Sequence, residues 1–175
     1  MKTLIAMIMS SLLSGLAHAE QISCRVVAIS DGDSFDCATT ASTQIRVRMA
    51  EIDAPERKQP YGQQAKQALT KLIYDKSVML HVHSIDRFGR TLARVFIGTL
   101  DVNSSMVQQG AAWAYTEQLK DQNLRDTETF ARNMDKGLWA QPAEDIVAPW
   151  KWRYAGRINE HAKKQTRPQT SFSQF

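Results

Sequence analysis

Cysteine and histidine are scarce in this chain, which has two cysteines and four histidines among 175 residues. Two cysteines alone cannot build a structural zinc site. His81 and His83 lie two residues apart on a predicted strand, a pattern more typical of a solvated strand face than of a metal site. Beyond residue 19 there is no long apolar run, and there is no internal repeat. The composition therefore excludes a cysteine-rich zinc module and a protein with several membrane-spanning helices.

The first 19 residues have the pattern of an export signal. Lys2 gives a positive start, the segment from Leu4 to Leu16 is apolar, and Ala17-His18-Ala19 fits a small-x-small cleavage site. The alternative is an uncleaved membrane anchor, although the apolar part is short for a span with anchoring flanks. We predict a signal peptide over residues 1–19 and an exported chain from Glu20, periplasmic or secreted, without stable membrane insertion after cleavage.

The mature chain is mildly basic. Without Lys2, 21 lysines and arginines face 18 acidic residues, a net charge of +3. This balance is compatible with a polyanionic partner without proving one. The length suits one domain with a real core, which we place at residues 20–150 and expect to be monomeric.

Cys24 and Cys37 are an even pair in a chain predicted to be exported, which favours a disulfide between them. They flank a predicted hairpin whose turn is Ser30-Asp31-Gly32-Asp33. The closed loop is short, so the chain-entropy gain should be about 3 kcal/mol.

The first half of the chain is rich in predicted strands. Alternating or β-branched apolar residues indicate strands over residues 25–29, 34–37, 42–49, 77–84 and 91–97. Helical spacing indicates helices over residues 62–75, 103–109 and 124–136, with Asn103 as a cap and with Phe130 and Met134 on the apolar face of the last helix. Five strands with a helix between the third and fourth predict an α+β fold, a five-stranded OB-fold Greek-key barrel with about three packed α-helices.

The densest charged motif is Arg48-Met49-Ala50-Glu51-Ile52-Asp53-Ala54-Pro55-Glu56, at the end of the third predicted strand. Strand alternation buries Met49 and turns Arg48 to the opposite face. Pro55 cannot donate to a strand ladder, so Asp53 and Glu56 leave the strand on a stiff turn. Carboxylates held in this way beside an arginine can bind a hard cation and steer a water; the alternative is a charged strand end in solvent.

Asp31 and Asp33 fit ordinary turn chemistry, because aspartate favours turns. Asp33 has a second interpretation, in which it shares one cation with Asp53 from an adjacent strand.

From residue 151 to residue 175 the chain becomes a basic tail, with Trp150, Trp152 and Tyr154 interleaved among its first cations. This mixture suits phosphate contacts and base stacking, while a solubilising, partly disordered tail is the alternative.

Three charged motifs occur in a fixed order. Asp31-Gly32-Asp33 is followed by Arg48 with Asp53-Ala54-Pro55-Glu56, and then by Asp86-Arg87-Phe88-Gly89-Arg90. This order resembles the staphylococcal nuclease (thermonuclease) family, and the resemblance runs from about Val26 to Trp139. No single motif is decisive, but their order, with the strands and the helix between them, is a strong signal.

The resemblance implies roles for the matched residues. Two carboxylates match calcium ligands, and the third protein ligand, a backbone carbonyl, falls where the family often has a hydroxyl residue. Two arginines match phosphate-binding groups, and one glutamate matches the proposed general base. The predicted Ca²⁺ ligands are Asp33, Asp53 and Ala54, the predicted catalytic residues are Arg48, Glu56 and Arg90, and the predicted substrate-binding residues are Arg87 and Tyr115.

The predicted function is an exported, Ca²⁺-dependent nuclease that hydrolyses phosphodiester bonds of DNA and RNA. The resemblance implies 3′-phosphate and 5′-hydroxyl products. A hard cation and two guanidinium groups would neutralise the charge of the transition state, and a carboxylate would take the proton of the attacking water. Two alternatives are a non-catalytic OB module that binds single strands and an accessory transfer protein whose basic tail docks to DNA or to an envelope partner.

Overall fold

The computed structural model describes residues 20–41, 43–115 and 121–165. The signal peptide predicted over residues 1–19 lies outside the described residues, as does the last part of the predicted tail, residues 166–175. In chain order the elements are β1 (Gln21–Ile29), β2 (Ser34–Ala38), β3 (Gln44–Met49), β4 (Ile52–Asp53), α1 (Gly62–Ile73), β5 (Ser77–Ile85), β6 (Thr91–Ile97), β7 (Leu100–Asp101), α2 (Val102–Gln108), β8 (Trp113–Ala114), α3 (Gln122–Asn133), η1 (Gly137–Ala140), η2 (Ala143–Asp145) and α4 (Pro149–Gln165).

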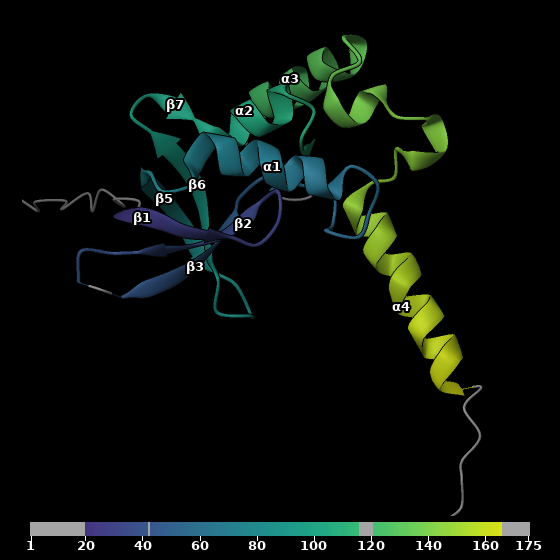
Figure 1. The fold of residues 1–175 in the computed structure, drawn as a ribbon, viewed down its shortest axis with the longest axis horizontal. Helices are drawn as coiled ribbons and strands as arrows, with labels where there is room; N and C mark the ends of the chain where they lie inside the picture. The colour runs from purple at the N-terminus through teal and green to yellow at the C-terminus, as the bar shows by residue number, and fades with distance from the viewer. Residues whose placement is uncertain (1–19, 42, 116–120, 166–175) are drawn as a thin grey trace, which may run out of the picture.

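Five strands form a closed barrel, which confirms the predicted α+β fold of the OB type. They are neighbours in the order β3, β2, β1, β5, β6, each antiparallel to the next. A parallel pairing of β3 with β6 closes the ring. Alternate side chains of the strands fill the interior, and α1 runs across the barrel in Figure 1. The largest fully buried residues of these five strands are Phe35, Met49, Leu80, Val26, Val47 and Val95.

The pairing of β3 with β6 brings two charged segments together. Arg48 lies opposite Leu92 in this pairing, so the end of β3 meets the beginning of β6. The turn at residues 86–90 comes directly before β6. Barrel closure therefore places the motif that begins at Arg48 beside the motif that ends at Arg90.

Helices α1 and α2 cover the barrel from positions near those predicted. Ala65, Leu69 and Ile73 form the buried face of α1. The prediction that Asn103 caps α2 is wrong. The cap is Asp101, whose carboxylate accepts a hydrogen bond from the Ser104 amide at 3.0 Å. Asn103 is fully buried instead, where its side chain accepts a hydrogen bond from the Val95 amide of β6 at 3.0 Å and donates one to the Ala50 carbonyl, just after β3, at 2.7 Å.

The prediction for the inner face of α3 is wrong in part. Leu124 is buried, but Phe130 and Met134 are 47% and 58% exposed. Glu128 takes an inner position, where its carboxylate accepts a hydrogen bond from the Ala114 amide at 2.6 Å. A backbone amide that needs an acceptor thus turns the helix away from the orientation that its apolar residues alone would favour.

The predicted disulfide is confirmed. Cys24 on β1 is bonded to Cys37 on β2, with their Cα atoms 5.6 Å apart. The bond closes the hairpin whose turn carries Asp31 and Asp33. In the described part of the chain, no helix is long and apolar enough to cross a membrane.

The basic segment that we predicted as a partly disordered tail is helical over its described part. Helix α4 begins at Pro149, just before the predicted boundary, and continues to Gln165. Its first turn lies against the domain, and the rest projects away from the barrel (Figure 1).

Candidate active site

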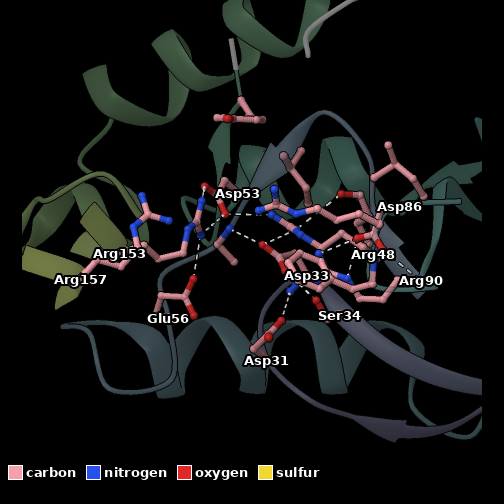
Figure 2. A pocket seen from close by; sticks show the side chains of 17 residues that line it. Asp31, Asp33, Ser34, Arg48, Asp53, Glu56, Asp86, Arg90, Arg153 and Arg157 are labelled. Atoms are coloured by element: carbon pink, nitrogen blue, oxygen red, sulfur yellow. Dashed lines mark hydrogen bonds and ion pairs between the residues drawn. The ribbon is translucent and has the colours of Figure 1, made fainter. Parts of the chain in front are cut away.

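The charged motifs line one cleft of about 740 Å³ at the end of the barrel where β3 meets β6. Figure 2 shows their side chains converging on it from the barrel strands, the 86–90 turn and α4. All eight predicted catalytic, metal-binding and substrate-binding residues belong to this lining. The polar residues of the lining are Asp31, Asp33, Ser34, Arg48, Asp53, Glu56, Asp86, Arg87, Arg90, Tyr115, Arg153 and Arg157.

Asp33 is held rigidly in the turn between β1 and β2. Its amide bonds the Asp31 carboxylate at 3.1 Å, and its own carboxylate accepts hydrogen bonds from the Ser34 hydroxyl at 3.1 Å and the Ala54 amide at 2.6 Å. The side chain is buried. Asp31, which we interpreted mainly as turn chemistry, thus fixes the loop that positions Asp33.

Arg48 joins the two predicted ligand carboxylates. Its Nη1 lies 2.5 Å from Asp33 Oδ2, and its Nη2 lies 2.8 Å from Asp53 Oδ1. Asp53 stands on β4, a two-residue strand paired with β8, so that Asp53 lies opposite Trp113. One guanidinium therefore spans two carboxylates that come from different strands.

Burial dominates the electrostatics of this pair. Loss of solvent raises the pKa of Asp33 to about 6, against the opposing effect of Arg48. Burial also raises the pKa of Asp53, although hydrogen bonds from Arg153 act in the other direction. Two carboxylates kept close together and away from water need neighbouring positive charge to stay ionised. The site supplies part of that charge through Arg48 and Arg153.

Glu56 lies at the edge of the cleft with a side chain that is 37% exposed. Gln59 fixes the turn at Glu56 through two hydrogen bonds. The Gln59 side-chain oxygen accepts one from the Glu56 backbone amide at 3.1 Å, and the Gln59 backbone amide donates one to the Glu56 carbonyl at 2.8 Å. Glu56 Oε1 lies 2.7 Å from Arg153 Nη1. The carboxylate is thus both fixed by its loop and accessible from the cleft.

Arg90 reaches the cleft from the other side, at the end of the 86–90 turn. Asp86 holds it through Oδ2, which lies 2.8 Å from both Nε and Nη2 of Arg90. The other Asp86 oxygen accepts hydrogen bonds from the amides of Phe88 and Arg90. Arg87 lies over the Phe88 ring at 4.8 Å. The turn therefore holds Arg90 in a fixed orientation and places a second cation, Arg87, over the Phe88 ring.

Ala54 and Tyr115 also line the cleft. Ala54 directly follows Asp53, and its amide contacts Asp33. The Tyr115 ring lies 5.4 Å from the Trp150 ring, next to the start of α4. Within residues 20–41, 43–115 and 121–165, no three His, Cys, Asp or Glu side chains are grouped as a ready metal site.

The sequence did not reveal that Arg153 belongs to the cleft. Its guanidinium lies 2.7 Å from Asp53 Oδ2 and 2.7 Å from Glu56 Oε1, across about a hundred residues of chain. The only sequence signal was the mixture of cations and aromatics that begins at Trp150. Nothing in the sequence indicated the supporting parts of Asp86 and Gln59, because both depend on the geometry of turns.

Comparison with known proteins agrees with this geometry. The family model described as Staphylococcal nuclease homologue matches residues 46–141. A Haemophilus influenzae protein named as an uncharacterized endonuclease is 42% identical over 156 residues, covering 89% of this chain and 86% of that protein. A micrococcal nuclease of Shigella flexneri is 39% identical over 143 residues, covering 75% of this chain and 80% of that protein. With the OB-type barrel and a match over more than half its length, the chain belongs to the staphylococcal nuclease homologue family.

Proposed function

We propose that this protein is an exported, Ca²⁺-dependent nuclease that hydrolyses phosphodiester bonds of DNA and RNA and leaves 3′-phosphate ends. The general activity, a nuclease, is supported by the family. The observation that carries the finer proposal is the convergence of Asp33, Asp53, Glu56, Arg48 and Arg90 on one cleft.

The donor set fits a hard divalent cation. Asp33 and Asp53 supply carboxylate oxygens, and the Ala54 backbone would supply a carbonyl oxygen, which are the ligands that Ca²⁺ prefers. Both carboxylates are buried, with pKa values raised by desolvation, and they already lie on either side of one guanidinium. A bound cation would supply the positive charge that these acids need and would help to neutralise a scissile phosphate.

The remaining residues divide the chemistry between them. Arg48 and Arg90 enter the cleft from two sides and can each engage two phosphate oxygens through the planar fork of the guanidinium. Their charges stabilise the extra negative charge of the five-coordinate transition state. Glu56, accessible and fixed by its turn, accepts the proton of the attacking water. The scheme uses no cysteine, serine or histidine nucleophile.

Export is the second part of the proposal. It is supported by the pattern of residues 1–19 and by the disulfide, which persists in oxidising compartments. Whether the destination is the periplasm or the medium is tested by fractionating cells that express the full chain.

The test of function is cleavage of plasmid DNA and of RNA by the purified protein, with Ca²⁺ or with EDTA. We expect cleavage of both substrates, abolished by EDTA, with 3′-phosphate ends identified by mass spectrometry of a cut oligonucleotide. Arg48→Ala, Glu56→Ala and Arg90→Ala should each fold and cut about 100-fold more slowly or worse. Arg46→Ala is the matched control, since Arg46 lies on the same strand but is exposed outside the cleft.

Two results would contradict the proposal. Wild-type rates in all three variants would remove these residues from the chemistry. An oligonucleotide that is bound but left intact in the presence of Ca²⁺ would instead identify a non-catalytic binding module.

A further inference from the structure

Arg153 pairs with two of the three acids that the proposed chemistry needs, Asp53 and Glu56. Its Nη1 bonds Asp53 Oδ1 at 3.0 Å and Glu56 Oε1 at 2.7 Å, and its Nη2 bonds Asp53 Oδ2 at 2.7 Å. Asp53 is one of the predicted cation ligands, and Glu56 is the predicted base. Arg153 is therefore paired with groups that would have other partners in the proposed reaction.

The same guanidinium is well placed to change partners. The Arg153 side chain is 38% exposed, in contrast to the Arg48 side chain at 15%, so Arg153 borders the open part of the cleft. An arginine stays charged under all ordinary conditions and presents five N–H donors. If Asp53 binds a cation and Glu56 contacts the attacking water, the N–H donors of Arg153 are released. The phosphate oxygens of a nucleic-acid strand can then accept hydrogen bonds from them.

Arg157 extends the same positive surface. It lies one helical turn after Arg153, and residues four apart share one face of a helix. Both arginines line the cleft, and Figure 2 shows them on the same side of it, where α4 enters the view. Arg157 is exposed. The two side chains thus form a strip of positive charge that leads out of the cleft along α4.

The beginning of α4 is fixed to the domain, so this strip has a defined position. The Trp150 ring lies 5.6 Å from Trp113 and 5.4 Å from Tyr115. Just before the helix, the Val147 carbonyl accepts a hydrogen bond from the Gln59 side chain at 2.5 Å. Gln59 is also the residue that fixes the turn at Glu56, so α4 and the predicted base share one support. Groups held in place before binding lose less freedom when substrate arrives.

We propose that Arg153 and Arg157 form a phosphate-binding strip that contacts the sugar-phosphate backbone beside the scissile bond. This inference rests on the proposed nuclease function and assigns α4 to substrate binding. Arg153 pairs with Asp53 and Glu56 when the cleft is empty of nucleic acid and moves to phosphate oxygens when a strand is bound. The strip reads backbone charge and so does not select sequence.

The test is the salt dependence of binding to a fluorescein-labelled, 12-nucleotide single-stranded DNA, followed by anisotropy in Ca²⁺. All variants are made in a Glu56→Gln background so that the strand stays intact, and their unfolding midpoints are recorded. Each lost phosphate contact lowers the slope of log K against log salt by about 0.7 for a single strand, equivalent to about five-fold weaker binding at 0.1 M salt. Arg153→Ala and Arg157→Ala should each show this change, whereas Arg153→Lys should keep most of the slope.

Lys151→Ala is the matched control. It removes one positive charge from the same helix, but Lys151 is exposed and lies outside the cleft lining. We expect its slope to stay at the parent value. Arg157→Ala keeps the test decisive even if Arg153→Ala disturbs the fold. The hydrogen bonds that hold Asp53 and Glu56 in this network come from Arg153 and remain in Arg157→Ala.

Three results would overturn the inference. Slopes for Arg153→Ala and Arg157→Ala equal to that of Lys151→Ala would show that neither arginine contacts phosphate. Tighter binding by Arg153→Ala with an unchanged slope would make Arg153 an autoinhibitory latch. Cleavage by the unaltered protein is measured in parallel. If the protein cleaves but the slopes are unchanged, only the phosphate-binding strip is contradicted. If the protein neither cleaves nor binds the strand, both the nuclease proposal and this inference are contradicted.

Discussion

Gly32 packs so closely on Ala54 that a β-carbon at residue 32 would lie 2.7 Å from the β-carbon of Ala54. It would also lie 2.8 Å from the β-carbon of Ala65 on α1. Neither neighbour has a flexible end that can move aside. This contact places the Asp33 turn against the Ala54 amide, and both belong to the predicted cation site.

Gly32→Ala should therefore weaken the fold and the activity together. We expect a loss of about 1–3 kcal/mol in the free energy of unfolding, because the added methyl overpacks a rigid contact. Cleavage at saturating Ca²⁺ should fall, since Asp33 moves away from Asp53. Urea denaturation and initial rates measure the two effects. Gly156→Ala is the control: it has open space around its position, and it should cut normally. Equal behaviour of the two variants would contradict the prediction.

The disulfide should stabilise the hairpin that carries Asp33. Cys24 and Cys37 are thirteen residues apart, which corresponds to about 3 kcal/mol in the chain-entropy estimate. Wild-type protein in dithiothreitol, and the Cys24→Ala/Cys37→Ala variant, should lose a comparable amount in urea denaturation. The variant should be insensitive to reductant. An unchanged midpoint for wild-type protein whose thiols are demonstrably reduced would argue against this role.

Asp86 should govern activity through Arg90 without being needed for the fold. The Asp86 carboxylate bonds both Nε and Nη2 of Arg90. In Asp86→Asn the guanidinium loses its fixed orientation, and a small misplacement in an active site can cost about 100-fold in rate. We expect kcat to fall by about 10- to 100-fold with a nearly unchanged unfolding midpoint. Asp36→Asn, which removes a carboxylate from a surface ion pair with Arg46, is the control. Wild-type kcat in Asp86→Asn would show that Arg90 is oriented by other groups.

Asp121 should make stability depend on pH in the acid range. Its pKa lies below the ordinary 3.8, because the carboxylate accepts a hydrogen bond from the Asn123 amide and pairs with Arg94 at 2.8 Å. A carboxyl group with a lowered pKa in the folded state stabilises the protein above its ordinary pKa, and this contribution is lost as the pH falls through the folded value.

The measurement compares wild type with Asp121→Asn, which keeps a capping side chain but removes the charge. The difference in unfolding free energy should be about 1 kcal/mol at pH 6 and should shrink below pH 3.8. Asp126→Asn, at an exposed position on the same helix, should show a smaller difference at pH 6. A difference for Asp121→Asn that grows on acidification would have the wrong sign.

Trp150 should decide whether α4 stays docked. Trp150→Ala removes the ring that contacts those of Trp113 and Tyr115, and aromatic contacts of this kind contribute about 0.5–1.5 kcal/mol beyond the area they bury. Limited proteolysis should then cut between the domain and α4 faster than in wild type. Trp152→Ala tests the same helix at an exposed residue and should be cut at the wild-type rate. Resistance equal to wild type in Trp150→Ala would show that other contacts hold the helix.

The barrel and most of the cleft were predictable because they depend on local patterns. Alternation over residues 42–49 predicted that Arg48 faces away from the core. The order of the charged motifs, through the family that it resembles, indicated which residues of the acidic turns belong to the site. The missed features depend on contacts between distant segments. Asn103 was assigned to a cap because the sequence does not show that its side chain bonds the Val95 amide of β6 and the distant Ala50 carbonyl. Phe130 was predicted to lie on the buried face of α3, because no sequence pattern shows that the Glu128 carboxylate accepts a hydrogen bond from the Ala114 amide.

Arg153 shows the same limit at the site itself. A basic, aromatic segment after Trp150 is evident from composition, but its pairing with Asp53 and Glu56 requires α4 to begin at one position and to point in one direction. That position is set by Gln59 and by the ring contacts of Trp150. A pattern of charges predicts what a segment can bind, whereas tertiary contacts decide where it binds.

The parallel pairing of β3 with β6 has a kinetic consequence. Arg48 and Arg90 become neighbours only when two strands more than forty residues apart in the chain join, and such long-range contacts form more slowly than hairpins do. During refolding, circular dichroism will report strands and helices as they form, but cleavage will return only with closure of this seam. The return of nuclease activity therefore measures how fast β3 and β6 pair, which a spectroscopic signal for secondary structure does not.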